Sequence, residues 1–293
     1  MEIFAVIQNF LNNREKRECN PNAIKTYSRQ LSLLARWLEK HHSTNIEIVT
    51  SKILNEYVSH LRDCEKKLSP TTIRQRAKTI RTFARWIHET GIVTDNPNIG
   101  FIIPKKPHKL PKCLPPDQIH KLISAETATR DRAIIFLILD SGMRRGEVAQ
   151  LEIDDLDLVR GMAHVKHGKG DKERWVIFAK KTTKELEKWI NERRAQPGVT
   201  ALFTSRHGKP MNAPAIYKII KRVAKTAGVN VSTHALRHTF ATNYLDRGGN
   251  IHDLQTLLGH EDITTTMIYV STSLERIRQT YKQLSFLDNM PGE

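Results

Sequence analysis

The chain has few cysteines and no long apolar run. Its three cysteines, Cys19, Cys64 and Cys113, are far apart, and no Cys-x-x-Cys pair occurs. This spacing predicts neither a disulfide framework nor a zinc site and favours a reducing, cytoplasmic location. The longest apolar run, at 133–139, is too short to cross a bilayer. The N-terminus lacks the basic start and the cleavage site of a signal peptide.

Signatures of nucleotide and metal chemistry are also missing from the sequence. There is no Gly-x-x-x-x-Gly-Lys-Ser/Thr loop and no metal-holding His-x-His. The sequence therefore gives no sign of ATP, a metal or another cofactor.

Acidic residues are fewer than basic ones. The chain of 293 residues has 31 Asp and Glu against 47 Lys and Arg, a formal net charge of +16. Such a surplus favours a polyanionic partner, nucleic acid before an anionic membrane. The length allows one large or two medium domains.

Prolines gather in one segment. Residues 104–116 contain five prolines in thirteen positions, which excludes a helix or a central strand. We predict a helical domain at 1–103, an extended linker at 104–116 and a second domain at 117–293.

The first domain shows helical periodicity throughout, with expected helices near 2–14, 21–41, 50–65 and 69–90. The second and fourth helices each carry a basic stripe beside an apolar one. These stripes could be solvated faces, but two stripes with hardly an acid between them favour contact with DNA phosphates. The expected DNA-binding residues are Lys25, Arg29, Arg36, Arg74, Lys78, Arg81 and Arg85, with Lys218, Lys221 and Arg222 as further candidates in the second domain.

The second domain has a mixed pattern. A buried helix at 131–140 and a short helix at 144–151 precede strands near 157–158, 162–167 and 173–178. Tight turns separate the strands and predict a small antiparallel sheet. Further helices are expected near 181–195, 213–227, 234–247, 251–259, 262–269 and 273–284. The predicted fold class is mainly α with a small antiparallel β-sheet.

Several polar motifs of the second domain are unremarkable one by one. They are Arg144 in Ser-Gly-Met-Arg-Arg-Gly-Glu, Lys169 in Gly-Lys-Gly, His234 and Arg237 in His-Ala-Leu-Arg-His, His260 in Leu-Gly-His, and Tyr269 nine residues later. Together and in this order they resemble the tyrosine recombinase (phage integrase) family, most closely its Xer-type and transposon- or plasmid-resolvase branch. The resemblance covers essentially the whole chain. It implies a SAM-like core-binding domain followed by an α+β catalytic domain, which would grip a DNA duplex between them.

The resemblance also implies roles for these residues. Tyr269 would attack phosphorus and form a covalent 3′-phosphotyrosyl link, while Arg144 and Arg237 hold the non-bridging oxygens. Lys169 would protonate the departing 5′-hydroxyl, with Lys172 as a rival. His234 would orient Arg237 and the phosphate or accept the tyrosine proton, and His260 would bond a non-bridging oxygen. Glu147 would fix an arginine or histidine, or else be a surface carboxylate.

The expected function is site-specific DNA recombination without metal or ATP, serving resolution or integration of DNA elements such as mobile genetic elements. Its expected partner is double-stranded DNA with an inverted-repeat core site, bound by a homotetramer or by a heterotetramer with a sister recombinase. In the family a C-terminal segment docks on the neighbour, and here an apolar strip could do so: Leu274, Ile277, Tyr281 and Leu284. The alternatives are topoisomerase IB-like DNA relaxation and a non-catalytic DNA-binding regulator.

Overall fold

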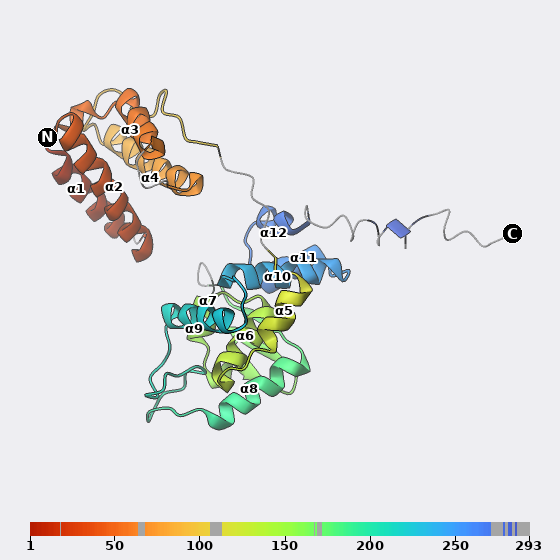
Figure 1. The fold of residues 1–293 in the computed structure, drawn as a ribbon. Helices are drawn as coiled ribbons and strands as arrows, with labels where there is room; N and C mark the ends of the chain where they lie inside the picture. Colours follow the sequence, from red (N-terminus) through yellow and green to blue (C-terminus); the bar gives the residue numbers. More distant parts are fainter. Residues whose placement is uncertain are drawn as a thin grey trace. The chain divides into compact units, whose positions relative to one another are not determined.

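The computed structural model describes residues 1–17, 19–63, 68–105, 113–166, 168, 172–270, 278, 281–282 and 285. They fall into two compact units, Met1–Lys109 and Leu110–Glu293 (Figure 1). Cys64, Lys169, linker residues 106–112 and most of the helix predicted at 273–284 lie outside the described residues. No helix in the described ranges is long and apolar enough to cross a membrane.

The first unit is a helical bundle, as the periodicity predicts. Two of its helices begin at a proline that follows a capping side chain. Asn20 accepts the backbone N–H of Asn22 at 2.9 Å, and Ser69 accepts that of Thr72 at 3.1 Å. The described elements are α1 (Ile3–Lys16), α2 (Pro21–His41), the short 3-10 helix η1 (Ile46–Ile48), α3 (Ser51–Asp63) and α4 (Pro70–Glu89).

The core of this unit is aromatic where α1 meets α4. Phe10 packs edge-on against Phe83 and Trp86, with ring centroids 5.5 and 5.4 Å apart. This packing leaves the polar faces of α2 and α4 for solvent or a ligand.

The second unit combines helices with a small sheet. In Figure 1, α6 lies in the middle of this unit, and it contacts α8, α9 and α10. Its described elements are α5 (Pro116–Ile123), α6 (Thr129–Ser141), α7 (Arg145–Gln150), the short 3-10 helix η2 (Ile153–Asp155), β1 (Leu156–Asp157), β2 (Met162–Val165), β3 (Arg174–Ile177), α8 (Lys180–Glu192), α9 (Ala213–Thr226), α10 (Thr233–Asp246), α11 (Ile251–Leu258) and α12 (Ile263–Val270).

The sheet is antiparallel in the order β1-β2-β3, which confirms the predicted arrangement. Its register pairs His164 with Trp175, whose rings stack on the outer face with centroids 4.7 Å apart. Because side chains alternate along a strand, Val165 and Val176 point into the core from the opposite face.

One helix differs from the sequence prediction. The helix α5 begins at Pro116, the last residue of the expected linker. A proline has no backbone N–H to donate, and the first helical position needs none, so Pro116 starts a helix instead of preventing one. The number of prolines alone cannot distinguish an extended linker from the start of a helix.

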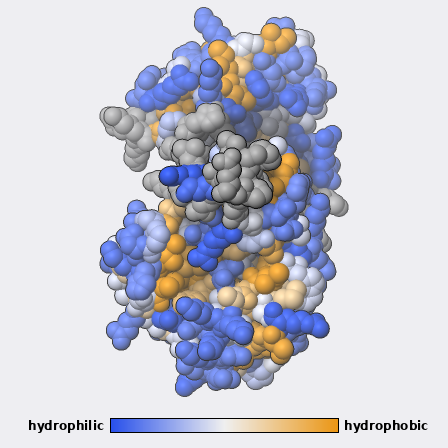
Figure 2. Space-filling model, turned by 90° about the vertical axis from the view of Figure 1, so that its right-hand side faces the viewer, coloured by the Kyte–Doolittle hydropathy of each residue, from blue (hydrophilic) through white to orange (hydrophobic). Residues whose placement is uncertain are grey.

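One face of the molecule is shown in Figure 2. It is largely hydrophilic (blue), with separate hydrophobic (orange) patches. Scattered apolar patches are normal on the surface of a folded protein.

Candidate active site

Glu147 is the negative centre of a cluster of arginines. It lies on α7, three residues after Arg144, and is only 5% exposed. Its Oε2 accepts the backbone N–H of Arg144 at 2.7 Å, and its Oε1 accepts Nη1 of the same residue at 2.9 Å. Of the two interpretations left open by the sequence, the geometry is that of a carboxylate fixing an arginine.

A second arginine, which the sequence motifs do not include, binds the same carboxylate. Arg174 on β3 donates through Nη1 and Nη2 to the two oxygens of Glu147, at 3.0 and 2.7 Å. Its Nε donates to the carbonyl of Leu257 at 2.9 Å, which links the strand to α11. Arg174 lies two residues before the buried Val176, and a charged residue at an inward-facing strand position is the signal that could have revealed it.

The environment keeps Glu147 ionised. Burial by itself would raise its pKa, but the hydrogen bonds and charge of Arg174, together with the hydrogen bonds of Arg144, bring the pKa below its ordinary value. Arg144 is thereby fixed by a permanent charge.

Arg237 on α10 is buried but keeps its charge. It donates through Nη1 to the carbonyl of Gly142 at 2.6 Å and through Nη2 to that of Leu258 at 2.7 Å. Burial, and then the charge of Arg144, lower its pKa to about 10, which still leaves it protonated at neutral pH. A desolvated guanidinium bound mainly to neutral acceptors can stabilise an added anion.

His260 bonds to this guanidinium. Arg237 Nη2 lies 3.0 Å from His260 Nε2, and His260 Nδ1 lies 2.9 Å from the hydroxyl of Thr266. Because arginine can only donate, Nε2 is the acceptor, and neutral His260 carries its proton on Nδ1. His260 follows Gly259, which ends α11 in the left-handed conformation with φ 61°.

Tyr269 on α12 lies next to the cluster. Its side chain is buried, and its hydroxyl lies 2.9 Å from Nδ1 of His238, a residue to which the sequence motifs assign no role. Burial raises the pKa of Tyr269, although the charge of Arg237 opposes the rise. The hydroxyl is therefore neutral at pH 7 and needs a proton acceptor before it can attack.

His234 lies at the exposed edge of this cluster. Its ring makes no hydrogen bond to any described residue, whereas Arg237 is bonded by His260 and Tyr269 by His238. The two contacts expected for His234 are thus made by other histidines. Burial, followed by the charges of Arg145, Arg237 and Arg144, lowers its pKa.

The predicted hairpin lysine, Lys169, lies outside the described residues. Its rival Lys172 is exposed, and its Nζ forms a 3.6 Å ion pair with Glu261, next to His260. A pair so exposed contributes little to stability.

The basic residues of the first unit divide into two groups. Arg74 donates to the carbonyl of Pro104, and Arg81 donates to that of Phe101 at 3.1 Å, so both are used to hold the chain after α4. The remaining predicted phosphate contacts of this unit have exposed side chains: Lys25, Arg29, Arg36, Lys78 and Arg85.

A groove between α2 and α4 is lined by three basic side chains. It has a volume of about 390 Å³, and Lys25, Arg29 and Arg76 line it together with polar side chains such as Gln30. Arg76 was not among the predicted residues, because it lies outside the stripe formed by Arg74 and Lys78.

The candidates on α9 also differ from one another. Arg222 is paired with the buried Asp131 at the start of α6, which occupies its guanidinium. Lys218 is exposed. Lys221 and Arg145 lie over the ring of Tyr217, 6.0 and 5.5 Å from its centroid.

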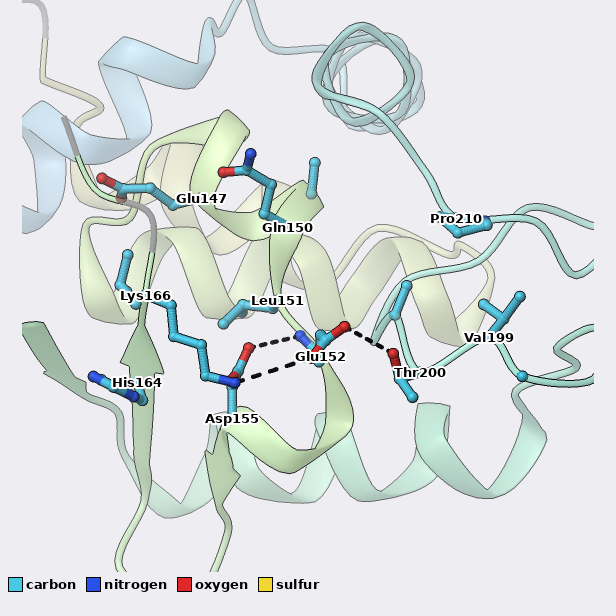
Figure 3. Close-up of a pocket in the computed structure, with 14 residues that line it drawn as sticks. Glu147, Gln150, Leu151, Glu152, Asp155, His164, Lys166, Val199, Thr200 and Pro210 are labelled. Carbon is cyan, nitrogen blue, oxygen red and sulfur yellow. Dashed lines mark hydrogen bonds and ion pairs between the residues drawn. The ribbon is translucent and has the colours of Figure 1, made fainter. Parts of the chain in front are cut away.

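A pocket of about 430 Å³ lies beyond Glu147 (Figure 3). Its lysine and two of its carboxylates are paired inside the pocket: Lys166 Nζ lies 2.6 Å from Asp155, and the hydroxyl of Thr200 donates to Glu152 at 2.8 Å. Since these charges are already paired, the phosphate-binding potential lies on the arginine side of Glu147. No described group of three or more His, Cys, Asp or Glu side chains is placed to hold a metal ion.

The geometry defines a class of site: buried cations converge near a tyrosine hydroxyl, an arrangement suited to attack on a phosphate ester. The sequence pattern of the phage integrase family matches residues 112–276, and that of the phage integrase SAM-like domain matches residues 2–101. Tyrosine recombinase XerD of Staphylococcus epidermidis is 32% identical over 290 residues, covering 95% of this chain and 97% of its own. Tyrosine recombinase XerC of Lactobacillus delbrueckii subsp. bulgaricus is 29% identical, covering 92% and 95%.

Solved structures agree with these matches. The crystal structure of XerA recombinase is 29% identical with a TM-score of 0.56, covering 96% of this chain and 98% of its own. The Tn1549 transposon integrase is 20% identical and has the same fold, with a TM-score of 0.77 and coverages of 97% and 100%. The chain belongs to the phage integrase family and is a tyrosine site-specific recombinase.

Proposed function

We propose that the arginine cluster binds a DNA phosphodiester and that Tyr269 attacks its phosphorus. The bond between Tyr269 Oη and phosphorus forms while the bond to the 5′-oxygen breaks, which leaves a 3′-phosphotyrosyl link and a 5′-hydroxyl. A 5′-hydroxyl from another strand reverses the step, so the bond energy is conserved. The observation that carries the proposal is the convergence of Arg144, Arg237 and His260 near the Tyr269 hydroxyl.

The roles proposed for the side chains follow from their chemistry. Arg144 and Arg237 hold the non-bridging oxygens, and their charge counts most as negative charge grows on the phosphorane. Glu147 fixes Arg144. His260, which orients Arg237, and His234, at the exposed edge, contact the phosphate oxygens. Lys169, between β2 and β3, protonates the leaving 5′-oxygen.

The proposed partner is double-stranded DNA with an inverted-repeat site. The groove between α2 and α4, with Lys25, Arg29 and Arg76, supports contact with the backbone of a duplex. The Tn1549 transposon integrase was solved with circular intermediate DNA, and a lambda integrase dimer was solved on a core site. We further propose that four copies, or two copies each of this chain and a sister recombinase, assemble on the DNA in the cytoplasm to resolve or integrate a mobile element.

Covalent trapping tests this chemistry. A duplex with inverted repeats is selected for binding from a randomised pool, rebuilt with a nick that lets the cleaved fragment escape, and incubated with the protein in EDTA. The expected result is a protein–DNA adduct on a denaturing gel that disappears in Tyr269→Phe, whose DNA binding is unchanged. An adduct that persists in Tyr269→Phe, or no adduct on a duplex that binds tightly, overturns the proposal.

A further inference from the structure

The Tyr269 hydroxyl has a histidine partner that none of the expected roles includes. His238 follows Arg237 on α10, and its Nδ1 lies 2.9 Å from Tyr269 Oη. The two rings are in contact, with centroids 5.4 Å apart and planes inclined by 55°. The half-buried ring of His238 is therefore an imidazole placed to exchange a proton with the nucleophile.

The charge of Arg237 sets the direction of this hydrogen bond. Arg237 lies near the Tyr269 hydroxyl, and its positive charge opposes the rise in the pKa of that hydroxyl. Because a guanidinium has only donor N–H groups, it cannot accept the hydroxyl proton, whereas a neutral imidazole nitrogen can, so the proton of Tyr269 points at His238. In this arrangement Nδ1 of His238 is the acceptor and Nε2 carries the ring proton.

We propose that His238 is the general base that takes the proton of Tyr269 during strand cleavage and returns it during rejoining. This inference deepens the proposed function and rests on Tyr269 being the nucleophile. As Oη bonds to phosphorus, its proton moves to His238 Nδ1 and gives an imidazolium, while the P–O5′ bond breaks and the general acid protonates the 5′-oxygen. In the reverse step the imidazolium proton returns to Oη as the phosphotyrosyl bond breaks.

The other histidines of the cluster are less suited to this task. His260 uses Nε2 to accept from Arg237 and Nδ1 to bond Thr266. His234 lies at the exposed edge, and its ring bonds no described residue. His238, by contrast, presents a ring nitrogen to Oη at hydrogen-bond distance.

The surroundings of His238 keep it neutral and ready to accept. Burial, followed by the charges of His234 and Arg237 on the same helix, lowers its pKa. Tyr269 faces it from α12, and the thiol of Cys113, ahead of α5, bonds its backbone carbonyl at 3.7 Å. The carboxylates on α6 and α11 have other partners. Asp131 pairs with Arg130 and Arg222, Asp140 accepts from Ala179 and Thr182, and Asp253 lies near Tyr244.

The test compares His238→Asn with wild type in the adduct assay between pH 6 and 10. Asparagine keeps a hydrogen-bonding group near Oη but cannot take the proton. We expect single-turnover cleavage to fall by about 10²–10³ at pH 7 and then to rise with pH as Tyr269 ionises without help. Wild type should be nearly flat over the neutral range. The control His234→Asn should lose rate without gaining this alkaline dependence, and replacing Tyr269 with a fluorinated tyrosine of lower pKa should rescue His238→Asn.

Equal loss at every pH, or a variant as fast as wild type, overturns the proposal, provided that His238→Asn melts normally and binds the duplex. Nitrogen-15 NMR of the free protein gives a readout that needs no cleavage. We expect an unprotonated Nδ1 whose resonance moves in Tyr269→Phe, and a proton on Nδ1 overturns the assignment. If wild type forms no adduct, the proposed strand-cleavage function fails as well, while the NMR result still decides the direction of the hydrogen bond.

Discussion

At the scale of single residues, the site depends on one buried anion. Glu147 receives hydrogen bonds from both Arg144 and Arg174. Removing this carboxylate would leave the charges of the two arginines without a buried counter-charge. Its carboxylate therefore serves the stability of the unit as well as the placement of Arg144.

Glu147→Gln should lower the free energy of unfolding by about 3 kcal/mol at pH 7, because two arginines lose their counter-charge in a buried setting. The folded pKa of Glu147 lies below its unfolded value of about 4.3, so its contribution is present above that pH and is lost as the pH falls through the folded pKa. The difference between wild type and Glu147→Gln should shrink in that acidic range. Urea unfolding between pH 3 and 7 measures it.

The exposed Glu173, paired with His164 at 3.2 Å, is a suitable control for that experiment. Glu173→Gln should change the stability by less than about 0.5 kcal/mol at pH 7. A Glu147→Gln variant as stable as this control would contradict the central role of the buried carboxylate.

Individual residues were partly predictable from the sequence. Arg144, Arg237, His260 and Tyr269 stand out through their order and spacing, and the structure brings them together. Arg174 and His238 do not stand out in the sequence, because each is a single polar residue within an ordinary strand or helix. Only the folded structure shows that Arg174 contacts Glu147 and that His238 contacts Tyr269. The shared face of α10 gives a partial signal, since His234 and His238 lie four positions apart.

At the scale of elements, the site is built from the ends of helices. The helices α6 and α11 both end in a left-handed glycine, Gly142 with φ 65° and Gly259 with φ 61°. Arg237 binds the carbonyl of Gly142 itself and that of Leu258, just before Gly259. The turn glycines thus set the position of the guanidinium.

Gly142→Ala should destabilise the second unit more than a left-handed conformation alone explains. Its added Cβ would lie 2.4 Å from a ring carbon of Phe240 and 2.9 Å from Leu258. Gly228, with φ 65° and no neighbouring atom within 4 Å of the point that a Cβ would occupy, isolates the conformational cost. We expect a loss of about 1 kcal/mol for Gly228→Ala and about 2–4 kcal/mol for Gly142→Ala, measured by thermal unfolding. Equal losses of stability in the two variants would mean that Phe240 and Leu258 move to make room for the added methyl group.

Most elements could be predicted because their signals are local. The caps Asn20 and Ser69 and the alternation in β2 and β3 placed those elements to within a few residues. The start of α5 could not be predicted, because a proline pair such as Pro115 and Pro116 is compatible both with an extended linker and with the start of a helix.

At the scale of the whole molecule, the net charge of +16 predicts an affinity for DNA that falls steeply with salt. Lys25→Ala and Arg29→Ala, in the groove between α2 and α4, should each reduce the slope of log K against log salt by about 0.9, because each removes one phosphate contact. Fluorescence anisotropy with a short mixed-sequence duplex measures the slope.

Lys52 on α3 is exposed and does not line that groove, so Lys52→Ala removes the same charge elsewhere. Its slope should stay close to that of wild type. If all three variants change the slope equally, the duplex responds to the total charge, and the groove is not its contact surface.

The two carbonyls bound by Arg237 bear on the choice of an inactive protein for cellular work. The guanidinium braces the C-terminal ends of α6 and α11, so Arg237→Ala would abolish cleavage and loosen the fold together. A phenotype of that variant would therefore not separate the loss of cleavage activity from the loss of folded protein. Tyr269→Phe removes only a hydroxyl and keeps the ring packed, which makes it the better inactive variant for such work.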